Sequence, residues 1–377
     1  MSYRIAIDIG TTNIEYKLYD YKPQTGFRKE LSGLCSKNCN SRFGADVMTR
    51  IAKAAGGDLE VMTSELRAQL KKDIHALVNL GGLRPDDVID CIAIAANTTM
   101  VHILMGYDSS SLGTFPFTPV DLGPINTDAA ALGFEGMDCD IFIFPGLSAF
   151  VGGDIVSGIS YINSFISVPS VYLFLDLGTN AEMVLMTADN IFTTSAAAGP
   201  AFETCAYGKA SVVIDALADM RSKGIIDETG LLSDEYFDTG IEHMGINFSQ
   251  KKIRDFQMAK SAIRTGIDIL VADSGINVSD IEKIFIAGTF GQNLNIDHAI
   301  SIGMLPEFAR DLSSALGNSS LKGAALNVLS PGFGTAQSSS VTAALNAPAD
   351  PSQKKIREIN LANHPDFNSM YIANMNL

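Results

Sequence analysis

The chain contains the stretch Ile5-Ala6-Ile7-Asp8-Ile9-Gly10-Thr11-Thr12-Asn13 near its start. Near its middle it contains the related stretch Leu173-Phe174-Leu175-Asp176-Leu177-Gly178-Thr179-Asn180. In each, an apolar run ends in an aspartate, a glycine and one or two threonines, and a second β-prone run follows at residues 14–19 and 183–187. Two such runs joined by a short polar turn are typical of a β-hairpin. Because the pattern occurs once in each half, we predict an internal duplication of whole domains.

Helix-like and strand-like segments alternate after each hairpin. Residues 59–80 and 249–273 have the apolar periodicity of helices, and another helix is expected from about Gly153. Short apolar runs predict buried strands at 88–95, 141–144, 283–287 and 324–329, and small residues predict a helix at 335–345. We therefore expect an α/β fold with helices packed on a central sheet in each half.

Domain boundaries follow from the breaks in these patterns. Pro169 interrupts a helical pattern, so we expect a first domain over residues 1–168 and a second over 169–346. The remaining residues, 347–377, contain three prolines and are expected to form an irregular surface extension.

Composition narrows the class of protein. Of the 377 residues, 46% are apolar and 18% are charged, which is typical of globular chains. The net charge of −15 argues against binding to nucleic acid or to an anionic membrane surface. The chain begins without a basic-then-apolar leader, and no apolar run reaches the roughly 18 residues that cross a bilayer. We therefore expect a cytoplasmic protein.

The two polar turns have chemistry suited to phosphate. Glycine allows the backbone to turn sharply, so that N–H groups and threonine hydroxyls can point into one space. Two such turns could hold the phosphates of a nucleotide from two sides. An ordinary hairpin turn is the alternative for one copy, but two copies in matching contexts favour phosphate binding. The predicted nucleotide-binding residues are Gly10, Thr11, Thr12 and Asn13 in the first turn and Gly178, Thr179 and Asn180 in the second.

The carboxylates beside these turns suit a magnesium ion, which prefers oxygen ligands and keeps several waters. Asp8 and Asp176 stand at the strand ends and are the predicted ligands, and Asp8 is also assigned a catalytic role. Glu182 follows the second turn, where it could contact magnesium or its water, or be an ordinary solvated glutamate.

A third loop completes the pattern. Residues 284–286 form an apolar run that leads into Ala287-Gly288-Thr289-Phe290-Gly291, where glycine permits close approach of a flat base or a sugar. Alone this loop is a weak signal. After two phosphate turns in this order it is specific, and we predict that Gly288, Thr289 and Phe290 contact adenosine.

The order of phosphate turn, phosphate turn and adenosine loop resembles that of actin, sugar kinases and heat-shock chaperone ATPases. Within that superfamily the chain resembles the ATPase part of the reductive activators of corrinoid proteins, over most of the chain from Tyr3 to about Leu345. The stretches that carry this resemblance are residues 6–12, Phe43-Gly44-Ala45-Asp46-Val47, Asn97-Thr98-Thr99-Met100, Phe150-Val151-Gly152-Gly153-Asp154, residues 175–182, Gly199-Pro200-Ala201-Phe202-Glu203, residues 259–266 and 287–291.

The resemblance implies a duplicated actin-like (ribonuclease H-like) ATPase fold, with two domains flanking a nucleotide cleft. It also implies ATP and Mg²⁺ as ligands, and a task in which ATP drives the uphill reduction of a Co(II) corrinoid protein to Co(I). Members of this family commonly carry an iron–sulfur domain ahead of the ATPase part. The five cysteines here show no cluster spacing, so we expect no iron–sulfur cluster in this chain and a separate iron–sulfur electron donor. The oligomeric state stays open, with a homodimer as one option.

The resemblance also suggests roles for single residues. Asp154 stands where related sugar kinases place a base, so it could orient the attacking water; a helix N-terminal aspartate is the alternative. Lys260 could touch the ribose or base, or belong to a solvated helix face. Asn97 could begin a helix as its cap or reach the cleft.

Two other functions remain open at this stage. A small-molecule kinase of the same fold would have its substrate pocket near Asp154. A non-catalytic regulator would bind nucleotide and signal through its shape.

Overall fold

The structure is a computed structural model, and it describes residues 2–22, 24–84, 86–165, 167–198, 210–291, 293–330, 333 and 355–377. Contacts within the chain divide it into two compact units. The first contains Met1–Val168 and Ser319–Gln353, and the second contains Pro169–Asn318 and Lys354–Leu377. This division differs from the expected domains, because residues 319–346 belong to the first unit and the last 24 residues to the second.

Each unit is built on a six-stranded sheet. The strands of the first are β1 (Ser2–Ile9), β2 (Asn13–Lys22), β3 (Phe27–Lys37), β4 (Ile89–Ala96), β5 (Ile125–Asp128) and β6 (Asp140–Ile143). Those of the second are β7 (Tyr172–Leu177), β8 (Ala181–Met186), β9 (Asn190–Ala196), β12 (Lys283–Ala287), β13 (Ser313–Gly317) and β14 (Lys355–Glu358). A separate small hairpin consists of β10 (Ile241–His243) and β11 (Ile246–Phe248).

The two sheets have the same plan, which confirms the predicted duplication. Their strand orders are β3-β2-β1-β4-β6-β5 and β13-β12-β7-β8-β9-β14. In the first, β1 pairs antiparallel with β2 and parallel with β4; in the second, β7 pairs antiparallel with β8 and parallel with β12. Five strands therefore correspond in order and direction, and each sheet adds one edge strand of its own, β5 or β14.

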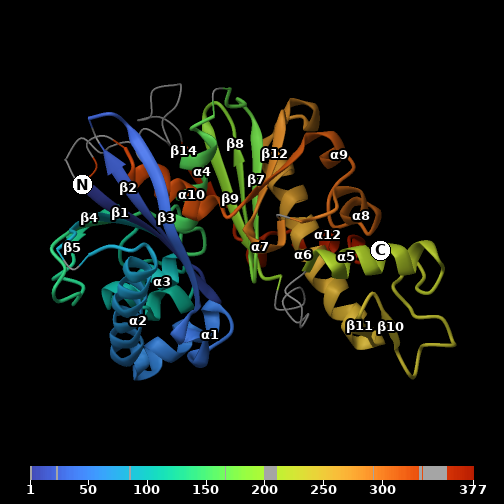
Figure 1. Cartoon of the computed structure of the whole chain (residues 1–377). Helices are drawn as coiled ribbons and strands as arrows, with labels where there is room; N and C mark the ends of the chain where they lie inside the picture. Colours follow the sequence, from blue (N-terminus) through green and yellow to red (C-terminus); the bar gives the residue numbers. More distant parts are fainter. Residues whose placement is uncertain are drawn as a thin grey trace. The chain divides into compact units, whose positions relative to one another are not determined.

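Helices complete both units (Figure 1). The first contains η1 (Cys39–Phe43), α1 (Val47–Lys53), the π-helical turn η2 (Ala54–Asp58), α2 (Leu59–Leu80), α3 (Thr98–Met105), η3 (Ser110–Gly113), α4 (Gly153–Ile162) and α10 (Ser319–Val328). The second contains α5 (Ala210–Ser222), α6 (Gln250–Ser274), η5 (Val278–Asp280), α7 (Gly288–Gly291), α8 (Ile296–Ser301), α9 (Ala309–Leu312), η6 (Leu361–Asn363) and α12 (Phe367–Ala373). The structure confirms the predicted helices at 59–80 and 249–273 and the predicted strand at 283–287. The two helical patterns are too long for a strand, and the apolar run at 283–287 is too short for a helix.

Alternation along β1 decides which face of the first sheet receives which helices. Tyr3, Ile5 and Ile7 point to the face covered by α2 and α3, where they join a core that includes Met62 and Leu66. The opposite face carries the polar residues of β1 and is covered by α4 and α10 (Figure 1). A β-strand places successive side chains on opposite faces, so one strand serves both the core and the polar side.

Helix α10 lies along β1 in the opposite direction, with a charge of β1 at each end. The Ser320 hydroxyl, in its first turn, donates to the Asp8 carboxylate at 2.8 Å. Arg4 donates to the Val328 and Ser330 carbonyls at 2.6 and 3.3 Å, at its last turn. An anion at the N-terminus and a cation at the C-terminus both interact favourably with the helix dipole, and each stabilises the helix by about 0.3–1 kcal/mol.

The strand predicted at residues 324–329 was wrong, because this segment forms the end of α10. Short apolar runs do not distinguish a strand from a buried helix segment. Here tertiary packing selects the helix, because α10 crosses α4 at very close range. A Cβ added at Gly323 would lie 1.8 Å from the Ser157 carbonyl oxygen, and the Ser157 hydroxyl donates to the Ser320 carbonyl at 2.7 Å. The helix predicted at 335–345 lies outside the described residues.

In the second unit, α6 packs on β8 and β9, and its inner side joins the main core of this unit. The C-terminal segment packs on α6 in turn, since Asn374 donates to Thr265 at 3.1 Å and Leu361 is buried. Strand β14 pairs parallel with β9. The expected irregular extension is therefore wrong from Lys355 onward, because contacts with distant parts of the chain give this segment regular structure.

Among the helices of the described ranges, none combines the length and the apolar character needed to cross a membrane.

The Gly323 contact gives a direct test of the α4–α10 packing. In the Gly323→Ala variant the new methyl group meets a backbone oxygen that has no room to move, so we expect a loss of about 1–3 kcal/mol of stability. Thermal unfolding followed by circular dichroism measures it. Gly56→Ala is the matched control, because a Cβ at Gly56 meets nothing within 4 Å. Equal melting temperatures for the two variants would contradict the close crossing.

Candidate functional site

The carboxyl ends of β1, β4 and β6 meet at one edge of the first sheet, because the three strands are parallel. The turn at Gly10–Thr12, the start of α3 and the loop before α4 follow these ends. A Cβ on Gly152 would lie 2.5 Å from the Asn97 Cα and from the Thr98 nitrogen. The close approach of these segments brings three of the sequence-predicted stretches to one place.

The carbonyls of the first turn all point into the protein. Asn38 donates from Nδ2 to the Gly10 carbonyl at 2.8 Å and from its backbone N–H to the Thr12 carbonyl at 2.9 Å. Arg50 donates from Nη2 to the Thr11 carbonyl. In a trans peptide the C=O and the next N–H point in opposite directions. The N–H groups of Thr11, Thr12 and Asn13 therefore point away from Asn38 and Arg50, as a row of donors suited to an anion.

Asn97 links this turn to α3. Its side-chain oxygen accepts from the Met100 N–H at 2.9 Å, which makes it the N-cap of α3. Its Nδ2 donates to the Thr11 hydroxyl at 3.2 Å. The predicted helix cap at Asn97 is therefore confirmed, and the same side chain also contacts the first turn.

The carboxylates beside the turns come in pairs across each hairpin. Asp8 lies opposite Glu15 in the β1–β2 register, and Asp176 lies opposite Glu182 in the β7–β8 register. Directly opposite residues share one face of a sheet. Glu15 was not among the predicted site residues, although its position after the first turn matches that of Glu182 after the second.

The Asp8–Glu15 and Asp176–Glu182 pairs bear on the predicted magnesium site. Within the described ranges, no group of three or more His, Cys, Asp or Glu side chains is gathered to hold a metal. Magnesium is commonly bound by one or two carboxylates together with waters and phosphate oxygens, so two-carboxylate pairs fit its chemistry. Asp8, Asp176 and Glu182 as ligands remain a prediction.

Asp154 lies in the first turn of α4, whose N-cap is Gly152. Its Oδ1 accepts from the Ile155 N–H at 2.8 Å. The side chain is partly buried, and this burial raises its pKa from 3.8 to about 6, although hydrogen bonds from the Ile155 and Asp154 N–H groups oppose the shift. A carboxylate that titrates this close to neutral pH is suited to proton transfer or to orienting a water.

In the second unit, the second turn and the predicted adenosine loop lie side by side. The Gly178 N–H donates to the Asn180 carbonyl at 2.9 Å and closes this turn. A Cβ added at Gly288, at the end of β12, would lie 2.3 Å from the Leu177 carbonyl oxygen and 2.7 Å from the Asp176 Oδ1. Glycine is thus required where the two loops touch. Thr289 and Phe290 continue α7, but their side chains lie outside what the structure describes.

Lys260 is buried in α6 and donates to the backbone carbonyl of Asn376. Gln257, one turn earlier, donates to the Met375 carbonyl at 2.9 Å. Burial lowers the Lys260 pKa to about 8, and the neighbouring Arg264 adds to this effect. The alternative of a solvated face is therefore wrong for Lys260, because the C-terminal segment covers it. Its contact with the nucleotide remains a prediction.

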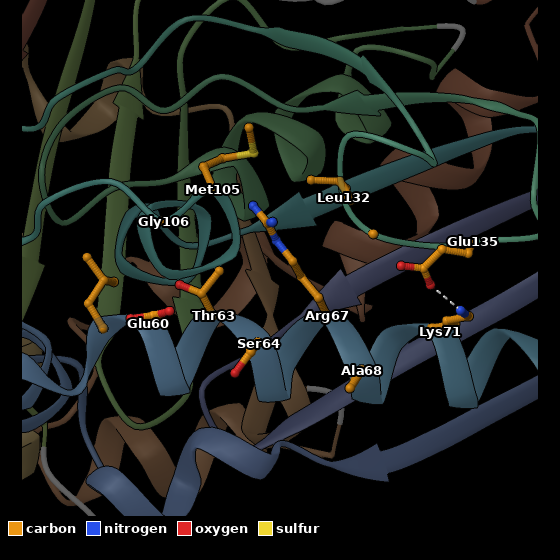
Figure 2. A pocket seen from close by; sticks show the side chains of 12 residues that line it. Glu60, Thr63, Ser64, Arg67, Ala68, Lys71, Met105, Gly106, Leu132 and Glu135 are labelled. Carbon is orange, nitrogen blue, oxygen red and sulfur yellow. Dashed lines mark hydrogen bonds and ion pairs between the residues drawn. The ribbon is translucent and has the colours of Figure 1, made fainter.

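A cavity of about 660 Å³ lies elsewhere in the first unit, along α2 (Figure 2). Arg67 points from α2 toward Met105 and Leu132, and Lys71 pairs with Glu135 at one end (Figure 2). None of the sequence-predicted site residues lines this cavity. It is distinct from the edge of the sheet that carries the turn.

Comparisons with known proteins agree with this architecture. A family model described as the RACo middle region matches residues 3–164, and one described as the C-terminal domain of RACo, the ASKHA domain, matches residues 170–209 and 206–377. The corrinoid activation enzyme RamQ of Eubacterium limosum is 27% identical over 87% of this chain and 64% of its own length. A [Co(II) methylated amine-specific corrinoid protein] reductase of Methanosarcina barkeri is 26% identical over 49% of this chain and 43% of its own.

Among solved structures, a reductive activator for corrinoid, iron-sulfur protein matches with a TM-score of 0.82 and 26% identity. The match covers 100% of this chain and 66% of that one. The chain thus spans less than two thirds of the length of each of these relatives. The fold is that of an actin-like ASKHA ATPase, and since the two RACo models together span nearly all of the sequence, the chain belongs to the family of reductive activators of corrinoid proteins.

Proposed function

We propose that this chain binds and hydrolyses Mg-ATP and couples the resulting domain closure to the reduction of a Co(II) corrinoid protein to Co(I). A separate iron–sulfur protein would supply the electron. The observation that carries the proposal is the first turn, whose carbonyls are all held inward so that consecutive N–H groups face outward. Together with the family membership, this supports polyphosphate binding as the basis of the activity.

The residues divide the work as follows. The N–H groups and hydroxyls of the two turns hold the phosphates, and the loop at Gly288 approaches the adenosine with Lys260. Asp8 with Glu15, and Asp176 with Glu182, are the carboxylates that would hold Mg²⁺. This ion, when bound, neutralises charge on the phosphate oxygens. The Ser320 hydroxyl orients the Asp8 carboxylate from the start of α10.

Asp154 would orient the attacking water in hydrolysis. With a pKa of about 6 it is mostly ionised at neutral pH, yet basic enough to accept a proton from that water. The same position would suit a small-molecule kinase, in which the Asp154 carboxylate would accept a proton from a substrate hydroxyl. Phosphate release without an acceptor separates hydrolysis from the kinase reaction.

The proposed partners are the corrinoid protein and the iron–sulfur donor, and not nucleic acid or a membrane. The net charge of −15 agrees with this, because it repels polyanions. We propose the cytoplasm as the compartment, since cobalt in the Co(I) state requires reducing surroundings.

The function is tested by phosphate release from Mg-ATP under anaerobic conditions, with and without a Co(II) corrinoid protein and a reduced iron–sulfur donor. We expect slow release that rises with the corrinoid protein, together with the absorbance change of Co(II) to Co(I). Asp8→Ala should abolish both, since it removes a proposed magnesium ligand. Asp90→Ala is the matched control, because Asp90 is exposed at the start of β4.

Tight binding of ATP without hydrolysis or cobalt reduction under any of these conditions would contradict the activator. Consumption of ATP that occurs only with an added small-molecule acceptor, and that yields ADP and the phosphorylated acceptor, would favour the kinase.

Asp154 makes a separate, pH-dependent prediction. Asp154→Asn should lower hydrolysis by about a hundredfold or more, while the ATP dissociation constant changes little. In the wild type the hydrolysis rate should rise as pH passes through about 6, because the ionised form is the active one. The variant should lack this rise. A rate profile from pH 5 to 8 measures it, and an unchanged profile in the variant would exclude Asp154 as the base.

Asp154 should also affect stability in a defined direction. Its pKa is raised in the folded state, so its contribution is most favourable below pH 3.8 and is lost as pH rises through about 6. Asp154→Asn should therefore stabilise the protein at pH 7.5 by at most about 3 kcal/mol, and less at pH 5. Melting temperatures at the two pH values measure this. An equal change at both would contradict the burial of a charged Asp154.

A further inference from the structure

Arg50 in α1 is a fully buried cation directly behind the first turn. Its side chain is 0% exposed. Nε donates to the Gly44 carbonyl at 3.0 Å, Nη1 contacts the Met100 sulfur at 3.2 Å, and Nη2 donates to the Thr11 carbonyl. All three acceptors are neutral. No carboxylate of the described residues forms an ion pair with this guanidinium.

The local sequence places Arg50 there. Asp46 is the N-cap of α1, and its carboxylate accepts from the N–H and hydroxyl of Thr49, at 2.9 and 2.8 Å. This carboxylate is therefore engaged at the start of the helix and does not contact the guanidinium. Gly44 has no space for a side chain, since a Cβ would lie 2.7 Å from the Thr49 side chain. The helix thus begins close against the chain that precedes it, which directs Arg50 toward Thr11.

Three stretches that carry the family resemblance meet at this one side chain. Thr11 belongs to the first turn, Gly44 to the stretch at residues 43–47, and Met100 to the stretch at residues 97–100. Neither Gly44 nor Met100 was among the predicted site residues. Their common contact with Arg50 gives them a role in holding this side chain behind the first turn.

Burying a charge without a counter-charge is unfavourable, and such groups are normally paired. Burial lowers the Arg50 pKa from 12.5 to about 10, so the side chain still carries its charge at neutral pH. The Thr11 carbonyl that it holds belongs to the same peptide as the Thr12 N–H, which points outward. A cation at the carbonyl polarises this peptide and makes its N–H a stronger donor. The charge of Arg50 therefore acts on whatever lies in front of the turn.

We propose that Arg50 is a positioning residue for polyphosphate, whose buried charge is balanced by the bound phosphates through the Thr11–Thr12 peptide. This inference rests on the proposed nucleotide binding and deepens it, because it assigns part of the affinity to phosphate and none to the base. Asn38 still holds the Gly10 and Thr12 carbonyls when Arg50 is changed, so the turn keeps two of its three supports.

Three variants separate charge from shape. Arg50→Lys keeps the charge but cannot reach all three acceptors at once, Arg50→Gln keeps amide donors without charge, and Arg50→Met keeps only the stem. Isothermal titration with ATP, adenosine and tripolyphosphate measures their affinities. We expect ATP and tripolyphosphate to bind in the order wild type, Lys, then Gln and Met, with the neutral variants weaker by about tenfold or more. Adenosine should bind within about twofold of the wild type in all of them.

Arg67→Met is the matched control. Arg67 is another partly buried arginine of the first unit, it donates to the Leu104 carbonyl at 2.9 Å, and burial also lowers its pKa. It lies on the cavity along α2 and should leave all three affinities unchanged. Melting temperatures without ligand show that each variant is folded. If Arg50→Met does not fold, the comparison of Arg50→Lys with Arg50→Gln decides.

The outcomes differ for the inference and for the function on which it rests. Equal ATP affinity in the Lys and Gln variants, or equal losses for ATP and adenosine, would overturn the role of Arg50. A wild type that binds no ATP would overturn the proposed function. Tripolyphosphate would still test Arg50 in that case, because the row of N–H groups recognises phosphate whatever the base, and an absence of tripolyphosphate binding to the wild type would overturn the inference as well.

Discussion

The inward hydrogen bonds of the Gly10, Thr11 and Thr12 carbonyls determine the character of the site. In a trans peptide the C=O and the N–H point in opposite directions, so donors that bind the carbonyls from behind the turn leave the N–H groups on its front. Asn38 and Arg50 supply those donors. Neither was predicted to belong to the site: Asn38 is the N-cap of η1, after β3, and Arg50 lies in the short helix α1. Asn38 and Arg50 can hold these carbonyls only because the fold brings them behind the turn that follows β1.

Duplication explains why each unit carries a related polar turn. Each unit has a hairpin followed by a crossover to a parallel strand, and each hairpin pairs an aspartate with a glutamate across its strands. The first turn is held from behind by the Asn38 and Arg50 side chains and by the Asn38 N–H, and the second contains a backbone hydrogen bond from the Gly178 N–H to the Asn180 carbonyl. The common plan therefore includes, in each unit, a polar turn whose backbone carbonyls are engaged in hydrogen bonds.

Helix α10 shows how electrostatics and packing act together in the first unit. Arg4 and Asp8 lie on the same face of β1 and interact with opposite ends of this helix. Gly323 lets the helix approach α4 so closely that any side chain would collide with the Ser157 carbonyl. The aspartate that is a predicted magnesium ligand is thus also the residue that receives the start of α10. Movement of this helix would alter the surroundings of Asp8 directly.

The sequence by itself determined the hairpins, the long helices, the duplication and the family, because these depend on local periodicity and on short motifs that a chain carries wherever it folds. It also led to the predicted turn residues and Asp154. Only the tertiary structure decided that residues 324–328 are helical, that the segment from Lys355 is ordered, and that Lys260 is covered. It alone placed Asn38, Arg50, Glu15 and Ser320 at the site. Each of these depends on contacts between segments far apart in the chain, as between Asp8 and Ser320, and no local pattern records such contacts.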